Sequence, residues 1–120
     1  MKQILIETLN RLGFVEGKTN LLQGTHNPDE PYPDTFTTFW INSTDDGAHF
    51  DNKTTSYDWS VTVILYSNNP TIVNTKPDEI RAALKAAGFI PQGKGNDIPS
   101  DNAAYTGWAM DFIYTEHLQI

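Results

Sequence analysis

Two stretches of the chain alternate between bulky and polar side chains at every second position, which is the period of a β-strand. One face of a strand at 57–66 would carry bulky apolar side chains throughout: Tyr57, Trp59, Val61, Val63 and Leu65. The opposite face begins polar and becomes apolar at its end. Residues 105–117 alternate in the same way, and residues 35–41 are rich in β-branched and aromatic side chains. We therefore expect three strands, one of which carries apolar residues on both faces.

Two other segments repeat apolar residues at helical spacing. Residues 2–12 place three leucines on one side of a helix, and Gly13 suits its C-terminal cap. A second apolar stripe runs over residues 78–87 and stops at Gly88: Ile80, Ala83, Leu84 and Ala87. Pro77 leaves two interpretations open. Either it kinks a helix that starts near Pro70, or it lies in the first turn of a new helix capped by Thr75.

Turn-forming residues dominate three further segments, which we expect to be loops: 24–35, 42–54 and 91–102. Short strands are expected at 21–24 and 89–90. The order of elements is helix, strands, helix, strands, and no linker or internal repeat divides the chain. It predicts a single α+β domain over residues 1–120, a mainly antiparallel sheet with two helices packed on one face. The helices would cover the apolar face of 57–66.

Composition narrows the class of protein. The formal net charge is −7, and the eight lysines and arginines form no basic stripe. This charge argues against nucleic acid or an anionic membrane surface as a bound partner. The absence of cysteine excludes disulfides and thiolate chemistry. No apolar run approaches the roughly 18–20 residues of a membrane span, and no signal peptide is recognisable at the start. We expect a cytoplasmic protein.

No arrangement of residues predicts catalysis. Asp45, Asp46, His49 and Asp51 lie close together in sequence and offer carboxylate and imidazole ligands, but they lack the spacing of a calcium loop. Such a segment is more typical of a solvated turn. The GKG sequence at 93–95 lacks the further glycine spacing and the Ser or Thr of a phosphate-binding loop, so a flexible turn is the simpler interpretation. We expect a protein that is not an enzyme and that has no metal or cofactor.

Short motifs follow one another in a fixed order between residues 35 and 116: FW at 39–40, DNK at 51–53, YDW at 57–59, YSNNP at 66–70, AAGF at 86–89, GKGND at 93–97, SD at 100–101, TG at 106–107 and YTE at 114–116. Their order and spacing resemble a family of small tail proteins of siphophages that infect Gram-positive bacteria. These are the tail terminators, also described as minor tail or head–tail joining proteins. The chain departs from the family at Trp108, where relatives carry a basic residue.

The resemblance implies an α+β domain that assembles as a hexameric ring on the end of the tail tube. Such a ring ends the addition of the major tail protein and offers a surface to head–tail connector proteins. DNA would pass through the ring without being specifically bound. The protein would be found in the host cytoplasm during assembly and afterwards in the virion.

We predict that contacts with neighbouring subunits or with the tube are made by the loop after residue 42 and by the second face of 57–66: Asp45, Asp46, His49, Phe50, Asp51, Ile64 and Tyr66. On this hypothesis Ile64→Asp impairs ring assembly more than folding. Two alternatives stay open. One is a neck protein that joins head to tail, and the other is a small carbohydrate- or metal-binding module. For a carbohydrate site the strand aromatics would have to be exposed, whereas their alternation favours core positions for Trp59 and Trp108.

Overall fold

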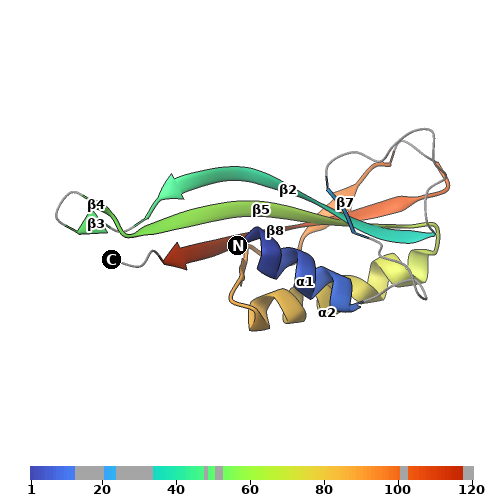
Figure 1. Ribbon diagram of the computed structural model, residues 1–120. Coiled ribbons are helices and arrows are strands. Elements are labelled where there is room, and N and C mark those ends of the chain that lie inside the picture. Colours follow the sequence, from blue (N-terminus) through green and yellow to red (C-terminus); the bar gives the residue numbers. More distant parts are fainter. Residues whose placement is uncertain (13–20, 24–33, 48, 51–52, 101–102, 118–120) are drawn as a thin grey trace.

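The computed structural model describes residues 1–12, 21–23, 34–47, 49–50, 53–100 and 103–117 of the 120-residue chain. Helices α1 (Lys2–Leu12) and α2 (Pro70–Ala86) lie against one face of a sheet (Figure 1). The strands are β1 (Leu21–Gln23), β2 (Thr35–Asp46), β3 (His49–Phe50), β4 (Lys53–Thr54), β5 (Ser56–Ser67), β6 (Ile90–Pro91), β7 (Asn96–Ile98) and β8 (Thr106–His117). The fold is α+β, as the sequence predicts.

The large sheet has the strand order β1-β2-β5-β8-β6, and β7 pairs with the same strand β8 as β6 does. Only β1 and β2 run parallel, and the other pairs are antiparallel. Strands β3 and β4 form a separate two-stranded hairpin. Three strands of 12 residues each, β2, β5 and β8, make up the body of the sheet.

The core lies between the two helices and the inner face of the sheet, meaning the face toward the helices. Its fully buried side chains come from both layers: Leu5, Leu9, Phe39, Val61, Val63, Leu65, Ile80, Leu84, Phe89, Met110 and Phe112. The apolar face predicted for 57–66 therefore does lie under the helices at Val61, Val63 and Leu65. Trp108 packs against this cluster, whereas Trp59 is half-buried and lies outside it.

Strand β2 is longer than the sequence predicts. Residues 42–46 (NSTDD) have turn chemistry and were expected to open a loop, but they continue the strand to Asp46. Their backbone pairs with β5 as far as Asp46 opposite Tyr57. Their side chains are exposed on both faces, so polar residues are tolerated there. The expected loop at 42–54 is therefore wrong over 42–46, and it also contains the short strands β3 and β4.

A β-bulge interrupts β2 at Asn42. Ile41 lies opposite Val61, but Ser43 lies opposite Ser60, so Asn42 is the extra residue. Its side-chain amide donates to Thr62 Oγ1 at 2.7 Å. The bulge reverses the alternation, because odd-numbered residues of β2 face the helices before it and even-numbered residues do so after it.

Helix α2 runs unbroken through Pro77, which excludes a new helix beginning after Thr75. The true N-cap is Asn69, whose side chain accepts from the amide of Thr71 at 3.0 Å. Thr75 instead donates its hydroxyl to the Thr71 carbonyl at 2.7 Å. Pro77 removes one helical hydrogen bond, but its ring is buried, and this burial offsets part of the loss.

The C-terminal end of α2 turns the chain back onto the sheet. Gly88 has φ +104°, a left-handed conformation that suits glycine. The amide of Phe89 donates to the Leu84 carbonyl at 2.9 Å, and that of Gly88 donates to the Lys85 carbonyl at 3.1 Å. These two bonds form a Schellman motif, and they place Phe89 in the core directly after the helix.

Residues 90–98 follow the outer edge of β8 as two short strands separated by a second irregularity. The expected loop at 91–102 is wrong where β7 pairs with β8. The GKG segment at 93–95 is tied to the rest of the fold, since its first two carbonyl groups accept side-chain hydrogen bonds. Trp108 Nε1 donates to the Lys94 carbonyl at 2.8 Å, and Arg81 Nε donates to the Gly93 carbonyl at 3.3 Å.

Candidate subunit interface

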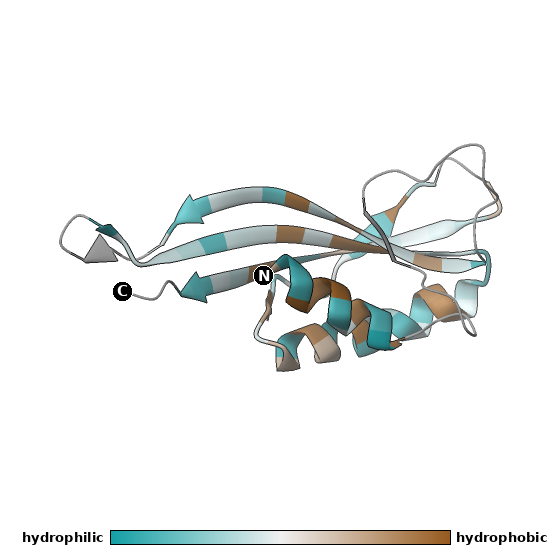
Figure 2. Cartoon of the chain, in the orientation of Figure 1, coloured by the Kyte–Doolittle hydropathy of each residue, from teal (hydrophilic) through white to brown (hydrophobic). Residues whose placement is uncertain are grey.

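The three long strands continue beyond the helix layer as an arm, formed by residues 43–46, 56–60 and 113–117 (Figure 1). The β3–β4 hairpin lies beyond its end. Hydrophilic residues dominate the ends of β2 and β8 in the arm, whereas apolar residues concentrate over the helices (Figure 2). The molecule is accordingly elongated, with extents of 53 × 29 × 27 Å.

Apart from Ile113, which pairs with Ile90, both backbone edges of the arm lack a partner strand in the described part of the chain. Strand β1 pairs only with residues 37–39 of β2, and β6 pairs only with Phe112 and Ile113 of β8. Charged side chains at both edges, including Asp45 and Glu116, discourage unspecific edge-to-edge pairing. The arm therefore offers surface to a specific partner while resisting aggregation.

The predicted site residues do not form one cluster. Asp45 and Asp46 are exposed at the end of β2, and as successive strand residues they point to opposite faces of the sheet. His49 and Phe50 form β3 beyond the arm, and Asp51 lies outside the described residues. Among the residues that the structure describes, no three His, Cys, Asp or Glu side chains could hold a metal ion.

Ile64 and Tyr66 belong to an internal cluster on the outer sheet face, meaning the face away from the helices. Ile64 is only 6% exposed. The rings of Phe36 and Tyr66 stack with their centroids 5.2 Å apart, and Tyr105 packs against Phe36. Because an aspartate at a buried position costs several kcal/mol or must be neutralised, we expect Ile64→Asp to impair folding itself, contrary to the prediction from sequence.

The Tyr105 hydroxyl belongs to the same end of the molecule. Burial raises the pKa of Tyr105 above its ordinary value of 10.0, and the negative charge of Asp34 raises it further. A tyrosine with a raised pKa stays neutral across the physiological range. Tyr105 is thus a neutral, half-buried side chain at this end of the outer face, with the charged Asp34 nearby.

Further along, the outer face becomes acidic and exposed. Asp45 lies directly opposite Asp58, and Asp111 accepts from Thr62 Oγ1 at 2.6 Å. Strands β2, β5 and β8 contain no lysine or arginine. The outer face therefore carries three carboxylates and no full positive charge from its three long strands.

Two large apolar side chains interrupt this acidic face. Trp40 is 43% exposed, and Ile90 is 56% exposed beside Ile113. Sequence reasoning missed both, because an aromatic or β-branched residue in a strand is more often a core residue. A weak signal existed for Trp40, since Phe39 and Trp40 are adjacent and only one of two neighbours can face the helices.

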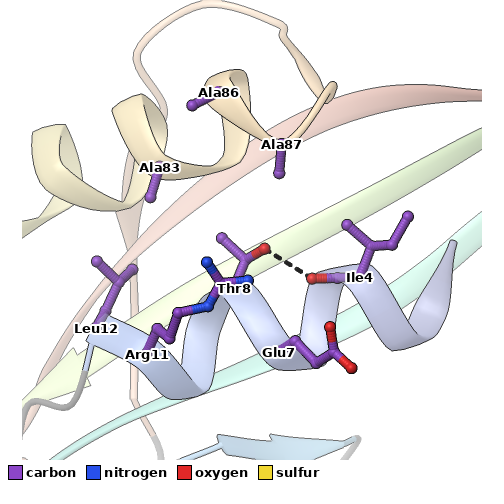
Figure 3. A pocket seen from close by; sticks show the side chains of 8 residues that line it. All are labelled: Ile4, Glu7, Thr8, Arg11, Leu12, Ala83, Ala86 and Ala87. Carbon is purple, nitrogen blue, oxygen red and sulfur yellow. Dashed lines mark hydrogen bonds between the residues drawn. The ribbon is translucent and has the colours of Figure 1, made fainter.

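The helix layer contains a groove of about 600 Å³ between α1 and α2 (Figure 3). Ala83 of α2 and its C-cap residue Ala87 point toward α1, and Ala86 also lines the groove, so little side-chain volume fills the space. On α1 it is lined by Ile4, Thr8 and Leu12 and by the charged side chains of Glu7 and Arg11. In the described part of the chain, Arg11 makes no ion pair. The groove thus combines apolar walls with the cation of Arg11 and with Glu7, whose carboxylate accepts from Gln3 Nε2 at 3.1 Å.

One polar group on the inner face of the arm also lacks a partner. The indole N–H of Trp59 is buried and donates no hydrogen bond within the described residues. An unsatisfied buried donor costs about 1–3 kcal/mol, so the arm is not optimised for the stability of the monomer alone.

Comparison with models of known protein families and with curated protein sequences finds no match for this chain. No helix among the described residues is long and apolar enough to cross a membrane. The function must therefore be inferred from the residues and surfaces described above.

Proposed function

We propose that the chain is a structural subunit of a phage or prophage tail, and that it forms a ring that caps the tail tube and ends tail polymerisation. The ring would also offer the surface to which head–tail connector proteins bind. The proposal joins the motif resemblance over residues 35–116 to the arm, which is the single structural observation that carries it.

The arm supports an assembly role because its outer face lacks a covering layer and most of its two backbone edges lack a partner strand within the described residues, while of its side chains only Tyr114 packs against the core. Its inner face contacts the rest of the fold at Tyr114, which packs on Phe89, and at Glu116, which pairs with the Met1 amino group at 3.3 Å. An extension that makes so few contacts gains little stability from burial. Its exposed strands are instead suited to contacts with neighbouring chains. The β3–β4 hairpin beyond the arm extends the reach of the subunit toward a neighbour or the tube.

The charge distribution supports passage of DNA through such a ring. Carboxylates on a surface that faces DNA repel its phosphates and keep the duplex from adhering. The outer sheet face of the arm, with Asp45 and Asp58, has this character. The proposal thus needs no nucleic-acid site and no catalytic group.

Tube assembly in the presence of the chain tests the proposal. The major tail protein of the phage or prophage that encodes the chain would be polymerised alone and with the chain, and tube lengths would be measured by negative-stain electron microscopy. We expect shorter tubes, with a ring of extra density at one end. An unchanged length distribution with bare tube ends would contradict the proposal. If the chain instead bound head–tail connector rings added to the same mixture and had no effect on tube length, it would be a neck protein.

A further inference from the structure

The two faces of the molecule carry opposite charge. Helices α1 and α2 together contain five basic and three acidic side chains. The long strands beneath them contain no basic residue, and their outer face presents Asp45, Asp58 and Asp111. A net-positive layer therefore lies on one side of the sheet and an acidic face on the other, although the whole chain is strongly acidic.

Apolar surface is divided between the same two faces. On the helix side, the α1–α2 groove has alanine walls, and Ile4 at its lining is 36% exposed. On the sheet side, Trp40 projects from β2. Thr62 and then Asp111 follow Trp40 in the same row across the sheet, so Asp111 lies two strands away, or about 10 Å. One face has a groove beside a cation, and the other has an indole beside a carboxylate.

We propose that a second copy of this chain docks head to tail, with Trp40 of one copy in the α1–α2 groove of the next and Arg11 of the groove paired with Asp111. Because the two patches differ and lie on opposite sides of one chain, the contact is heterologous and repeats from copy to copy. This inference rests on the proposed ring, for which it names the interface. Tryptophan and arginine are also the residues that most often dominate binding energy at interfaces.

A charge swap tests the pairing. Sedimentation velocity and light scattering would be measured on the full chain and on Arg11→Asp, Asp111→Arg, the double swap and Trp40→Ala. We expect each single variant to weaken self-association by about tenfold or more, and the double swap to recover most of the loss. Lys85→Asp is the matched control, since Lys85 is exposed on α2 outside the groove, and it should have little effect.

Cysteine cross-linking gives an independent readout, because the chain has no cysteine of its own. The variant with Arg11→Cys and Asp111→Cys should form a ladder of disulfide-linked chains on oxidation, in solution or on tail tubes. The variant with Lys85→Cys and Asp111→Cys should not form this ladder. Circular dichroism would show that each variant is folded.

Several outcomes would overturn the inferred contact: no self-association of the native chain alone or on tubes, a double swap no better than the single variants, or equal cross-linking from position 85. Its failure can be separated from failure of the proposed function. Swap variants that still cap tubes refute only this contact, whereas native chains that cross-link through 11 and 111 but never shorten tubes refute only the tail role.

Discussion

At Gly95 the backbone of residues 90–98 comes so close to β8 that a side chain has no room. A Cβ added there would meet the Ala109 carbonyl oxygen and Trp108 Nε1, while one added at Gly93 would meet no atom within 4 Å. Both glycines have positive φ, at +105° and +83°. Comparing alanine substitutions at the two positions therefore separates the effect of steric overlap from that of backbone strain.

We predict that Gly95→Ala lowers the free energy of unfolding by about 1–3 kcal/mol more than Gly93→Ala does, since only the former adds overpacking to strain. Urea unfolding of both variants measures the difference. Equal losses would mean that the close approach at Gly95 relaxes without cost.

The ionisation of Tyr105 reports on the packed end of the outer face. Because its folded-state pKa is raised, neutral Tyr105 contributes stability that is complete below the unfolded value of about 10 and is lost as pH rises through the folded pKa. We expect Asp34→Asn to lower this pKa while leaving it above 10.0, since burial is the larger cause. An NMR titration of the Tyr105 ring, resolved from the other four tyrosines, measures the change. A pKa unaffected by the substitution would show that Asp34 does not act on the hydroxyl.

At the scale of elements, the start of α2 depends on one side chain. Replacing Asn69 by alanine removes the acceptor for the Thr71 amide and should cost about 0.5–2 kcal/mol. Asn69→Ser keeps a cap of similar quality and serves as the control. Thermal unfolding would compare the two variants, and equal melting temperatures would show that the cap is not needed.

The elements that the sequence predicts well are those whose pattern is local. Strands β5 and β8 were placed to within about a residue because their alternation is unbroken, and Gly88 was correctly placed at the end of α2. The end of β2 and strand β7 were missed, because pairing with β5 and β8 overrides local turn chemistry. For α2, Pro77 left two starting points open, and the N-cap at Asn69 shows that the helix begins before Pro77.

The candidate interface could be predicted only in part, for a physical reason. Exposure depends on which neighbour covers a strand face, and this is a tertiary property. The sequence marks Ile64 and Trp40 alike as bulky strand residues. Ile64 is nevertheless buried, near the end of the outer face where Phe36 and Tyr66 stack, whereas Trp40 is exposed. The α1–α2 groove forms where small alanine side chains near the end of α2 face the side chains of α1. Neither segment of the sequence shows this by itself, because the groove depends on how the two helices pack together.

For the molecule as a whole, we predict unequal hydrogen exchange. Amides at the arm edges lack strand partners in the isolated chain and should exchange much faster than those of residues 61–65 in the core. Assembly on tail tubes should slow exchange in the arm and leave the core unchanged. Exchange measured by mass spectrometry on free and assembled chain tests this, and an arm equally unprotected in both states would argue against its role in contacts.

The bulge at Asn42 determines which face of the sheet each later residue of β2 occupies. If Asn42 instead paired regularly opposite Ser60, every later residue of β2 would move to the other face of the sheet, turning Thr44 outward and Asp45 inward. The carboxylate opposite Asp58 would vanish from the acidic face without any change in composition. The surface charge of this subunit is thus encoded partly by the spacing of its residues, and two chains with identical charges could present different faces to a neighbour.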